Sequence, residues 1–151
     1  MPKPELIALY KHWIRVDSMK YVLLQKDEAI PELKGLPQEL REFALIATSV
    51  PKLETLYGLL YVVIEGYREL GCSYPKVDEL LVREDYVDAL RRFRNAVFHY
   101  QKQPINEKLL GFLEAAESEK WIQQLHSAFE EFLLSVLPIE EMAKKYSGNG
   151  T

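Results

Sequence analysis

The sequence predicts an all-α protein, an antiparallel helical bundle of about five helices in one domain. Apolar residues recur at helical spacing along most of the chain, and strand-like alternation does not recur. Prolines and glycines divide the apolar stretches into lengths that suit helices. The 151 residues suit a single domain. We expect this domain over residues 1–138 and a frayed C-terminal extension over residues 139–151.

Two helical segments are expected in the first half of the chain. The first runs from about Pro4 to Gln25, because proline suits a first turn, where no amide donor is needed. The second runs from about Gln38 to Leu70, and Gly71 can cap it. Pro51 lies inside this second segment, so we expect a kink or a break there. The apolar stripe of the first segment comprises Leu6, Leu9, Trp13, Val16 and Leu23.

Three helical segments are expected in the second half. They run from about Arg83 to Gln101, from Asn106 to about Glu117, and from Glu119 to Leu137. Asn106 and Ser118 can cap the second and the third of these helices. The predicted buried stripe of the helix that starts at Arg83 comprises Tyr86, Leu90, Phe93, Val97 and Tyr100. The stripe of the last helix comprises Trp121, Leu125, Phe129, Phe132 and Val136.

The segment Arg94-Asn95-Ala96-Val97-Phe98-His99 carries the chemistry that stands out against this pattern. Arginine holds phosphate well, because its planar fork stays charged and donates two parallel hydrogen bonds. Histidine has an unperturbed pKa of about 6.5, so it can take and return a proton near neutral pH. Together the two side chains indicate cleavage of a phosphodiester without a metal. The competing interpretation is a solvated helix face.

This pattern resembles the signature of the HEPN superfamily, in which an arginine, often followed by a polar residue, precedes a histidine by a few positions. Arg94, Asn95 and His99 fill those places. HEPN domains are all-α bundles, and HEPN ribonucleases form dimers in which both copies of the motif face one cleft. The resemblance therefore implies a homodimer that binds and cleaves RNA, in a toxin or defence setting. It also implies an antitoxin partner, which in some subfamilies is a nucleotidyltransferase. Toxins of those subfamilies usually carry tyrosine two residues after the histidine, where this chain has Gln101.

The resemblance also implies a role for each motif residue. His99 acts as general base on the ribose 2′-hydroxyl and then as acid toward the leaving 5′-oxygen. Arg94 offsets the charge that builds on the phosphoryl oxygens, and Asn95 binds the phosphate or orients His99. The products carry a 2′,3′-cyclic phosphate and a 5′-hydroxyl. Many HEPN-like domains are instead non-catalytic modules that bind a nucleotide, RNA or a protein. A helical interaction protein with a chance motif is a third interpretation.

Helical geometry predicts where these side chains point. Asn95 and His99 point away from the apolar stripe, and Arg94 lies on its flank. Arg94 and His99 are then about 140° apart around the helix axis and about 7.5 Å apart along it, so a second copy of the helix would help to complete one site. Phe98 also points outward, toward either a partner or another helix of the same chain.

The charge pattern indicates that any surface that binds nucleic acid is small. The formal net charge is −4, which argues against a broad basic surface. Around the motif, however, the chain carries Arg91, Arg92, Arg94 and Lys102 without an intervening acidic residue. We expect Arg91, Arg92 and Lys102 to bind RNA phosphates. Glu65, in an apolar run, is expected either to pair with an arginine of the motif helix or to lie exposed.

Other kinds of site find no support in the sequence. It has no Walker loop, no dinucleotide fingerprint and no metal-site pattern, so we expect no metal and no cofactor. His12 and His126 are expected to be structural. Cys72 is the single cysteine, and no apolar run reaches the roughly 18 residues that a membrane span needs. We expect a cytoplasmic protein, because the N-terminal residues lack the apolar core of a signal peptide.

Overall fold

The computed structural model describes residues 2–24, 35–47, 49–103 and 106–147, and these residues form helices and connections without a β-strand. The described helices are α1 (Pro4–Leu24), α2 (Gln38–Ala47), α3 (Ser49–Glu69), α4 (Pro75–Leu81), α5 (Glu84–Phe98), α6 (Glu107–Glu114), α7 (Ala116–Val136) and α8 (Ile139–Ser147). The all-α prediction is confirmed, whereas the predicted number of helices is too low.

The additional helices arise at three places. The segment predicted from Gln38 to Leu70 divides into α2 and α3 close to Pro51, so the predicted break is confirmed. Pro51 itself lies in the first turn of α3, where its missing amide hydrogen breaks no helical bond. α4 covers Pro75–Leu81, where the sequence indicated only a short turn of helix from Val77 to Leu81. α8 covers Ile139–Ser147, within the extension for which we expected fraying. The remaining residues 148–151 of that extension lie outside the described part.

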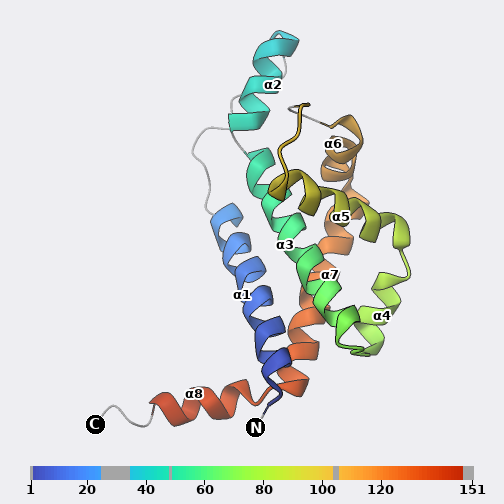
Figure 1. The fold of residues 1–151 in the computed structure, drawn as a ribbon. Coiled ribbons are helices and arrows are strands. Elements are labelled where there is room, and N and C mark those ends of the chain that lie inside the picture. Colours follow the sequence, from blue (N-terminus) through green and yellow to red (C-terminus); the bar gives the residue numbers. More distant parts are fainter. Residues whose placement is uncertain (1, 25–34, 48, 104–105, 148–151) are drawn as a thin grey trace.

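Three helices of 21 residues, α1, α3 and α7, form the body of the bundle. α1 runs antiparallel to α3 and to α7 (Figure 1). α3 packs against α1 and against α5, while α4 packs against α7. α2 and α8 extend from opposite ends of the body (Figure 1). The motif helix α5 is therefore held mainly by α3.

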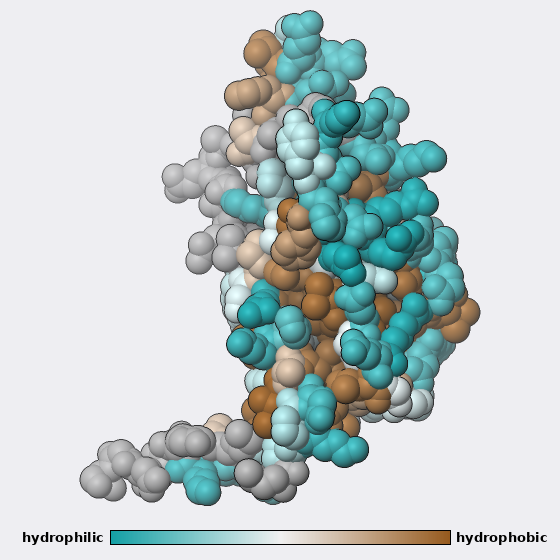
Figure 2. Space-filling view, viewed as in Figure 1, coloured by the Kyte–Doolittle hydropathy of each residue, from teal (hydrophilic) through white to brown (hydrophobic). Residues whose placement is uncertain are grey.

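The apolar stripes of the long helices meet in one core. In α1 the predicted stripe residues Leu9, Trp13 and Val16 are buried. In α7 the predicted stripe is buried except for Val136, which is exposed at the end of the helix. On the outside, Figure 2 shows hydrophilic side chains over much of the visible face, with hydrophobic ones gathered in the middle of the body. Helical periodicity therefore identified most of the core of these two helices.

Aromatic rings join the motif helix to its neighbours. The Tyr57 ring of α3 meets the Phe93 ring of α5 edge to face, with ring centres 5.4 Å apart. It meets the Phe112 ring of α6 in the same way, at 5.9 Å. Edge-to-face pairs are favourable beyond their buried area. The Phe93 ring also lies 5.8 Å from the Phe112 ring, so the middle of α5 is anchored by both α3 and α6.

Two predicted caps are confirmed. Gly71 follows α3 with a positive φ of 62°, which glycine adopts without strain. The side chain of Asn106 accepts a hydrogen bond from the Lys108 N–H at 3.0 Å and so begins α6. The third prediction is wrong, since α7 begins at Ala116 and places Ser118 inside its first turn.

Candidate functional site

Arg94 lies where the backbones of α5 and α3 come close together. A Cβ on Gly58 of α3 would lie 3.1 Å from the Cα of Arg94, so a larger residue there would push the two helices apart. Phe93, the preceding residue, is fully buried and fixes this part of α5 in the core. The backbone of Arg94 is therefore positioned by packing, independently of what its side chain binds.

The side chain of Arg94 is also bound to α3. Its Nη2 donates a hydrogen bond to Oε1 of Glu65 at 3.0 Å, and its Nη1 donates to Oδ1 of Asn95 at 3.2 Å. Its guanidinium carbon lies 5.6 Å from the centre of the Tyr61 ring, within cation–π range. The Arg94 side chain is 29% exposed and that of Glu65 is 46% exposed. Glu65 thus both pairs with the motif helix and lies exposed, so each of the two expectations for it is met.

Asn95, which helical geometry placed on the side away from the apolar stripe, is not fully open to solvent. It is half-buried and lines a cavity of about 260 Å³. The chain beyond α5 supplies part of the same wall through Gln101 and Gln103, which covers a side of the helix that would otherwise be open. Burial raises the pKa of the Glu54 carboxyl, which lines the cavity from α3. Helical periodicity did not predict this cover, because it does not describe the path of the chain after α5.

His99 lies just beyond the motif helix, and the prediction that this helix continues to Gln101 is wrong. α5 ends at Phe98, and His99 caps it with an extended backbone (φ −126°, ψ 138°). The N–H of His99 still donates to the Asn95 carbonyl at 3.0 Å, and Gln101 Nε2 donates to the His99 carbonyl at 3.2 Å. The His99 imidazole is exposed, and no described residue hydrogen-bonds it. It is free to meet a ligand.

Exposed aromatic rings flank His99. Phe98 is 57% exposed, so no described helix covers it. Tyr100, which we expected in the buried stripe, is 91% exposed. Val87, which the prediction left out, is buried instead. The helix ends here because the residues after Val97 find no core to pack against, and packing of an apolar face is what stabilises most helices.

The arginines that we expected to bind phosphate share one carboxylate. Arg91 Nη2 lies 2.7 Å from Asp88 Oδ1, and Arg92 Nε lies 2.9 Å from Asp88 Oδ2. Hydrogen bonds from Arg91 and then Arg92 hold the pKa of the Asp88 carboxyl below its ordinary value. Asp88 stands three and four residues before them, a spacing that the sequence already contained. One positive charge remains on this face, together with exposed Lys102, which has no ion pair among the described residues.

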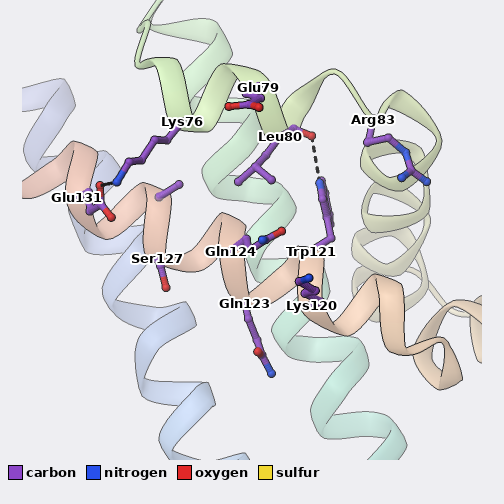
Figure 3. A pocket seen from close by; sticks show the side chains of 11 residues that line it. Lys76, Glu79, Leu80, Arg83, Lys120, Trp121, Gln123, Gln124, Ser127 and Glu131 are labelled. Atoms are coloured by element: carbon purple, nitrogen blue, oxygen red, sulfur yellow. Dashed lines mark hydrogen bonds and ion pairs between the residues drawn. The ribbon is translucent and has the colours of Figure 1, made fainter.

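A separate groove lies between α4 and α7 (Figure 3). Its volume is about 740 Å³. Trp121 forms part of its wall and donates its indole N–H to the Leu80 carbonyl at 3.1 Å. Lys76 and Glu131 form an ion pair at one end (Figure 3). No motif in the sequence predicted this groove, and neither Arg94 nor His99 lines it.

In the described part of the chain, no three His, Cys, Asp or Glu side chains gather closely enough to hold a metal ion. None of the described helices is long and apolar enough to cross a membrane. Comparison of the chain with protein-family models, with curated proteins and with solved structures found no match. The resemblance to HEPN domains therefore rests on the motif and on the helical fold.

Proposed function

We propose that this chain is a HEPN-like, metal-independent endoribonuclease that acts as a homodimer. The observation that carries the proposal is the placement of Arg94 and His99 at one end of α5. The arginine is fixed against α3 by Glu65, and the histidine is exposed at the helix end. A phosphate clamp benefits from a positioned cation, and a proton carrier must reach its substrate. Each side chain thus has the environment that its role needs.

In the proposed reaction, His99 removes the proton of a ribose 2′-hydroxyl, and the oxygen attacks the adjacent phosphorus. The bond between phosphorus and the 5′-oxygen breaks, and His99 returns the proton to that oxygen. The products carry a 2′,3′-cyclic phosphate and a 5′-hydroxyl, so atoms and protons balance without water. Arg94 stabilises the negative charge that develops on the non-bridging oxygens.

Glu65 has two opposing effects on this reaction. A guanidinium has more N–H donors than the two that Glu65 and Asn95 occupy, so Arg94 keeps donors for a phosphate. Glu65 holds the guanidinium in place while lowering the positive potential around it. Its removal is therefore expected to strengthen RNA binding and to loosen the position of Arg94.

The aromatic residues beside His99 support the homodimer. Phe98 and Tyr100 are exposed next to the motif, where the apolar surface of their rings remains in contact with water. A second copy over this end of α5 would bury both rings. It would also bring a second Arg94 and His99 to the same cleft and concentrate positive charge in an acidic chain. An antitoxin or nucleotidyltransferase partner stays a prediction of the resemblance.

One observation favours a second candidate, a non-catalytic HEPN-like module that binds a nucleotide, RNA or a protein. Every arginine of the motif region is bound to a carboxylate, Arg94 to Glu65 and both Arg91 and Arg92 to Asp88. Such ion pairs are common on protein surfaces that bind no ligand, and they reduce the attraction of the arginines for phosphate. In this candidate the Arg94–Glu65 pair joins α3 to α5, and His99 carries no proton.

The test is cleavage of a varied RNA pool by the purified protein in the presence of a strong chelator. We expect fragments that end in 2′,3′-cyclic phosphate and 5′-hydroxyl, identified by end-specific labelling. His99→Ala and Arg94→Ala should each lower the cleavage rate by about 100-fold or more. Arg94→Lys should restore only part of the rate, because an ammonium cannot reproduce the two-point grip of a guanidinium.

His12→Ala and Arg68→Ala are the matched controls. His12 lies on α1, away from the motif helix, and Arg68 forms a second ion pair between α3 and α5, with Glu84 at 2.9 Å. Both variants should keep the wild-type rate. Wild-type protein that binds the RNA pool through Arg94 and leaves it uncut would transfer the assignment to the non-catalytic module. An equal loss of cleavage rate in Arg68→Ala would show that Arg94 acts by stabilising the fold and not by binding phosphate.

A further inference from the structure

The cavity of about 260 Å³ beside Asn95 is rich in polar side chains and lies close to the motif histidine. Asn95 precedes His99 by four residues, which is one helical turn and about 6 Å along the axis of α5. The volume far exceeds the roughly 30 Å³ of a water molecule and lies just below the range for drug-sized ligands. The cavity therefore suits a single ring system one turn from His99.

This cavity is open to a ligand from solvent. Gln101, Gln103 and Asn106 line it and are exposed, and Asn95 is half-buried. Leu109 is buried and gives the wall an apolar part. A planar molecule can enter and meet both polar groups and an apolar surface, as a nucleobase requires.

The side-chain amides keep free donors and acceptors for such a molecule. Oδ1 of Asn95 and Oδ1 of Asn106 each accept a hydrogen bond within the chain, whereas their N–H groups donate to no described residue. Gln101 has the opposite state, since its Nε2 donates to the His99 carbonyl and its Oε1 remains an acceptor. The amides alone can therefore bind the edge of any base.

Glu54 adds a more selective group from α3. It lines the same cavity and is half-buried, and no described residue hydrogen-bonds its carboxyl group. Burial alone raises the pKa of this carboxyl, because nothing in the described chain compensates for the hydration it has lost. A ligand that donates hydrogen bonds to it would supply that compensation.

Among the four RNA bases, guanine matches a carboxylate best. A carboxylate has two acceptor oxygens and no donor. Guanine presents N1–H and N2–H side by side, so both oxygens receive a hydrogen bond. In adenine and cytosine the amino group lies beside an acceptor nitrogen, and in uracil N3–H lies between two carbonyl oxygens. Each of these bases would place an acceptor against the carboxylate.

The opposite edge of guanine also finds donors in the cavity. Its O6 and N7 are acceptors, and arginine is the residue that most often binds this pair. Arg92 lines the cavity, and among the described residues only its Nε is bound, to Asp88. The N–H groups of Asn95 and Asn106 are further donors for these acceptors.

We propose that this cavity binds a guanine base on the 5′ side of the cleaved RNA bond, and that Glu54 selects guanine by accepting hydrogen bonds from N1–H and N2–H. The inference rests on the proposed nuclease, because it places the ribose of the same nucleotide at His99. The base and the 2′-hydroxyl of one nucleotide lie a few ångströms apart, which the single turn between Asn95 and His99 can span.

The four nucleoside 3′-monophosphates are the probes, because each carries the base, ribose and phosphate found on the 5′ side of a cut. Each is titrated into the full-length protein while two-dimensional NMR follows backbone and side-chain amides. We expect guanosine 3′-monophosphate to bind saturably and about tenfold more tightly than the other three. Its binding should shift the side-chain amides of Asn95 and Gln101 and the backbone amide of Leu109.

Glu54→Gln should weaken the binding of guanosine 3′-monophosphate by about tenfold and strengthen that of adenosine 3′-monophosphate. A glutamine amide presents one donor and one acceptor, which match adenine. Glu69→Gln is the matched control, since it removes the same charge from α3 at an exposed position that does not line the cavity. It should leave both affinities unchanged. Equal changes in the two variants would overturn the role of Glu54.

The proposal and the proposed nuclease can fail separately. Equal affinity for all four mononucleotides, or binding that leaves Asn95 and Gln101 unshifted, would overturn the guanine site. So would cleavage of the varied RNA pool without an excess of guanine on the 5′ side of the cuts. Selective binding of guanosine 3′-monophosphate in the cavity, together with an uncut RNA pool, would support the guanine site and contradict the nuclease.

Discussion

The C-terminal end of α5 and the seam between α1, α3 and α7 each contain a histidine, in opposite surroundings. Around His99 the arginines are paired with carboxylates, as Arg94 is with Glu65, and the imidazole itself is exposed. Around His126 the imidazole is buried, and both its nitrogens and the indole N–H of Trp13 lack partners among the described residues. Water satisfies an exposed polar group, but a buried one depends on the protein or on a ligand. The proposed proton transfer therefore needs the first region, where solvent and substrate can reach the imidazole, whereas burial of the second imidazole is a cost to the folded state.

The two regions meet on α3. Tyr57 lines a cavity beside His126, between α1, α3 and α7, and a Cβ on Gly58, the next residue, would lie 3.1 Å from the Cα of Arg94. Changes at this point of α3 should therefore affect the motif helix first. Changes at His126 should leave it in place.

The largest effect on stability is expected at Gly58. Gly58→Ala should lower the free energy of unfolding by up to about 2 kcal/mol, since overpacking costs about 1 to 3 kcal/mol and the better helix propensity of alanine returns about 1 kcal/mol. Gly111→Ala in α6 is the control, because a Cβ there meets nothing within 4 Å. It should raise stability slightly. Urea unfolding of both variants measures the difference, and equal effects would show that the α3–α5 contact is looser than described.

A smaller effect of the opposite sign is expected at His126. His126→Phe should raise the free energy of unfolding by about 1 kcal/mol near neutral pH, because it removes two buried nitrogens without partners and keeps a ring against Trp13. Urea unfolding checks this result. A clear loss of stability would mean that the interaction with Asp17, whose Oδ1 lies 3.3 Å from Nε2, outweighs burial.

The same variant should change the response to acid. Burial, and then the charge of Lys20, lower the pKa of His126 in the folded state, so below about pH 6.5 the unfolded chain takes up the proton first. Stability from the neutral imidazole is complete above that pH and is lost as the pH falls from it toward the lower folded pKa. The advantage of His126→Phe should therefore widen from about pH 7.5 to about pH 5.5. A constant or shrinking advantage in urea unfolding at these two pH values would contradict the assignment.

The smallest effects are expected at the two ion pairs between α3 and α5. Glu65→Gln and Glu84→Gln should each lower stability by less than about 1 kcal/mol, and less still at high salt. Glu65→Gln should have the larger effect, because Arg94 is less exposed than Arg68. Only Glu65→Gln should tighten RNA binding, measured by fluorescence anisotropy with a labelled RNA. Equal tightening in both variants would indicate a general effect of net charge.

The parts of the fold that the sequence could predict depend on local pattern. The spacing of Leu9, Trp13 and Val16 predicted the buried face of α1, and Gly71 and Asn106 predicted helix ends, since propensity and capping act over a few residues. The failures depend on what the chain meets in space. Tyr100 continues the stripe of α5 in the sequence, yet it lies beyond the end of the core.

The features of the candidate site also divide into those that local pattern predicts and those that depend on packing in space. The pairing of Glu65 with the motif helix was one of two expectations, and the link from Asp88 to Arg91 and Arg92 follows a helical spacing already present in the sequence. The cavity beside His126 had no such signal, because it is formed by three helices far apart in the chain. His126 was expected to be structural, and its lack of partners emerges only from packing.

The central claim, attack by a ribose 2′-hydroxyl at the end of α5, can be tested most directly with one modified RNA. An RNA with a mapped cleavage site is compared with the same RNA carrying a single 2′-deoxynucleotide on the 5′ side of the cleaved bond, both in a strong chelator. We predict that the wild-type protein cuts the unmodified RNA to a 2′,3′-cyclic phosphate, leaves the modified bond intact, and loses this cleavage in His99→Ala. Cleavage of the modified bond, or cleavage that persists in His99→Ala, would contradict the account.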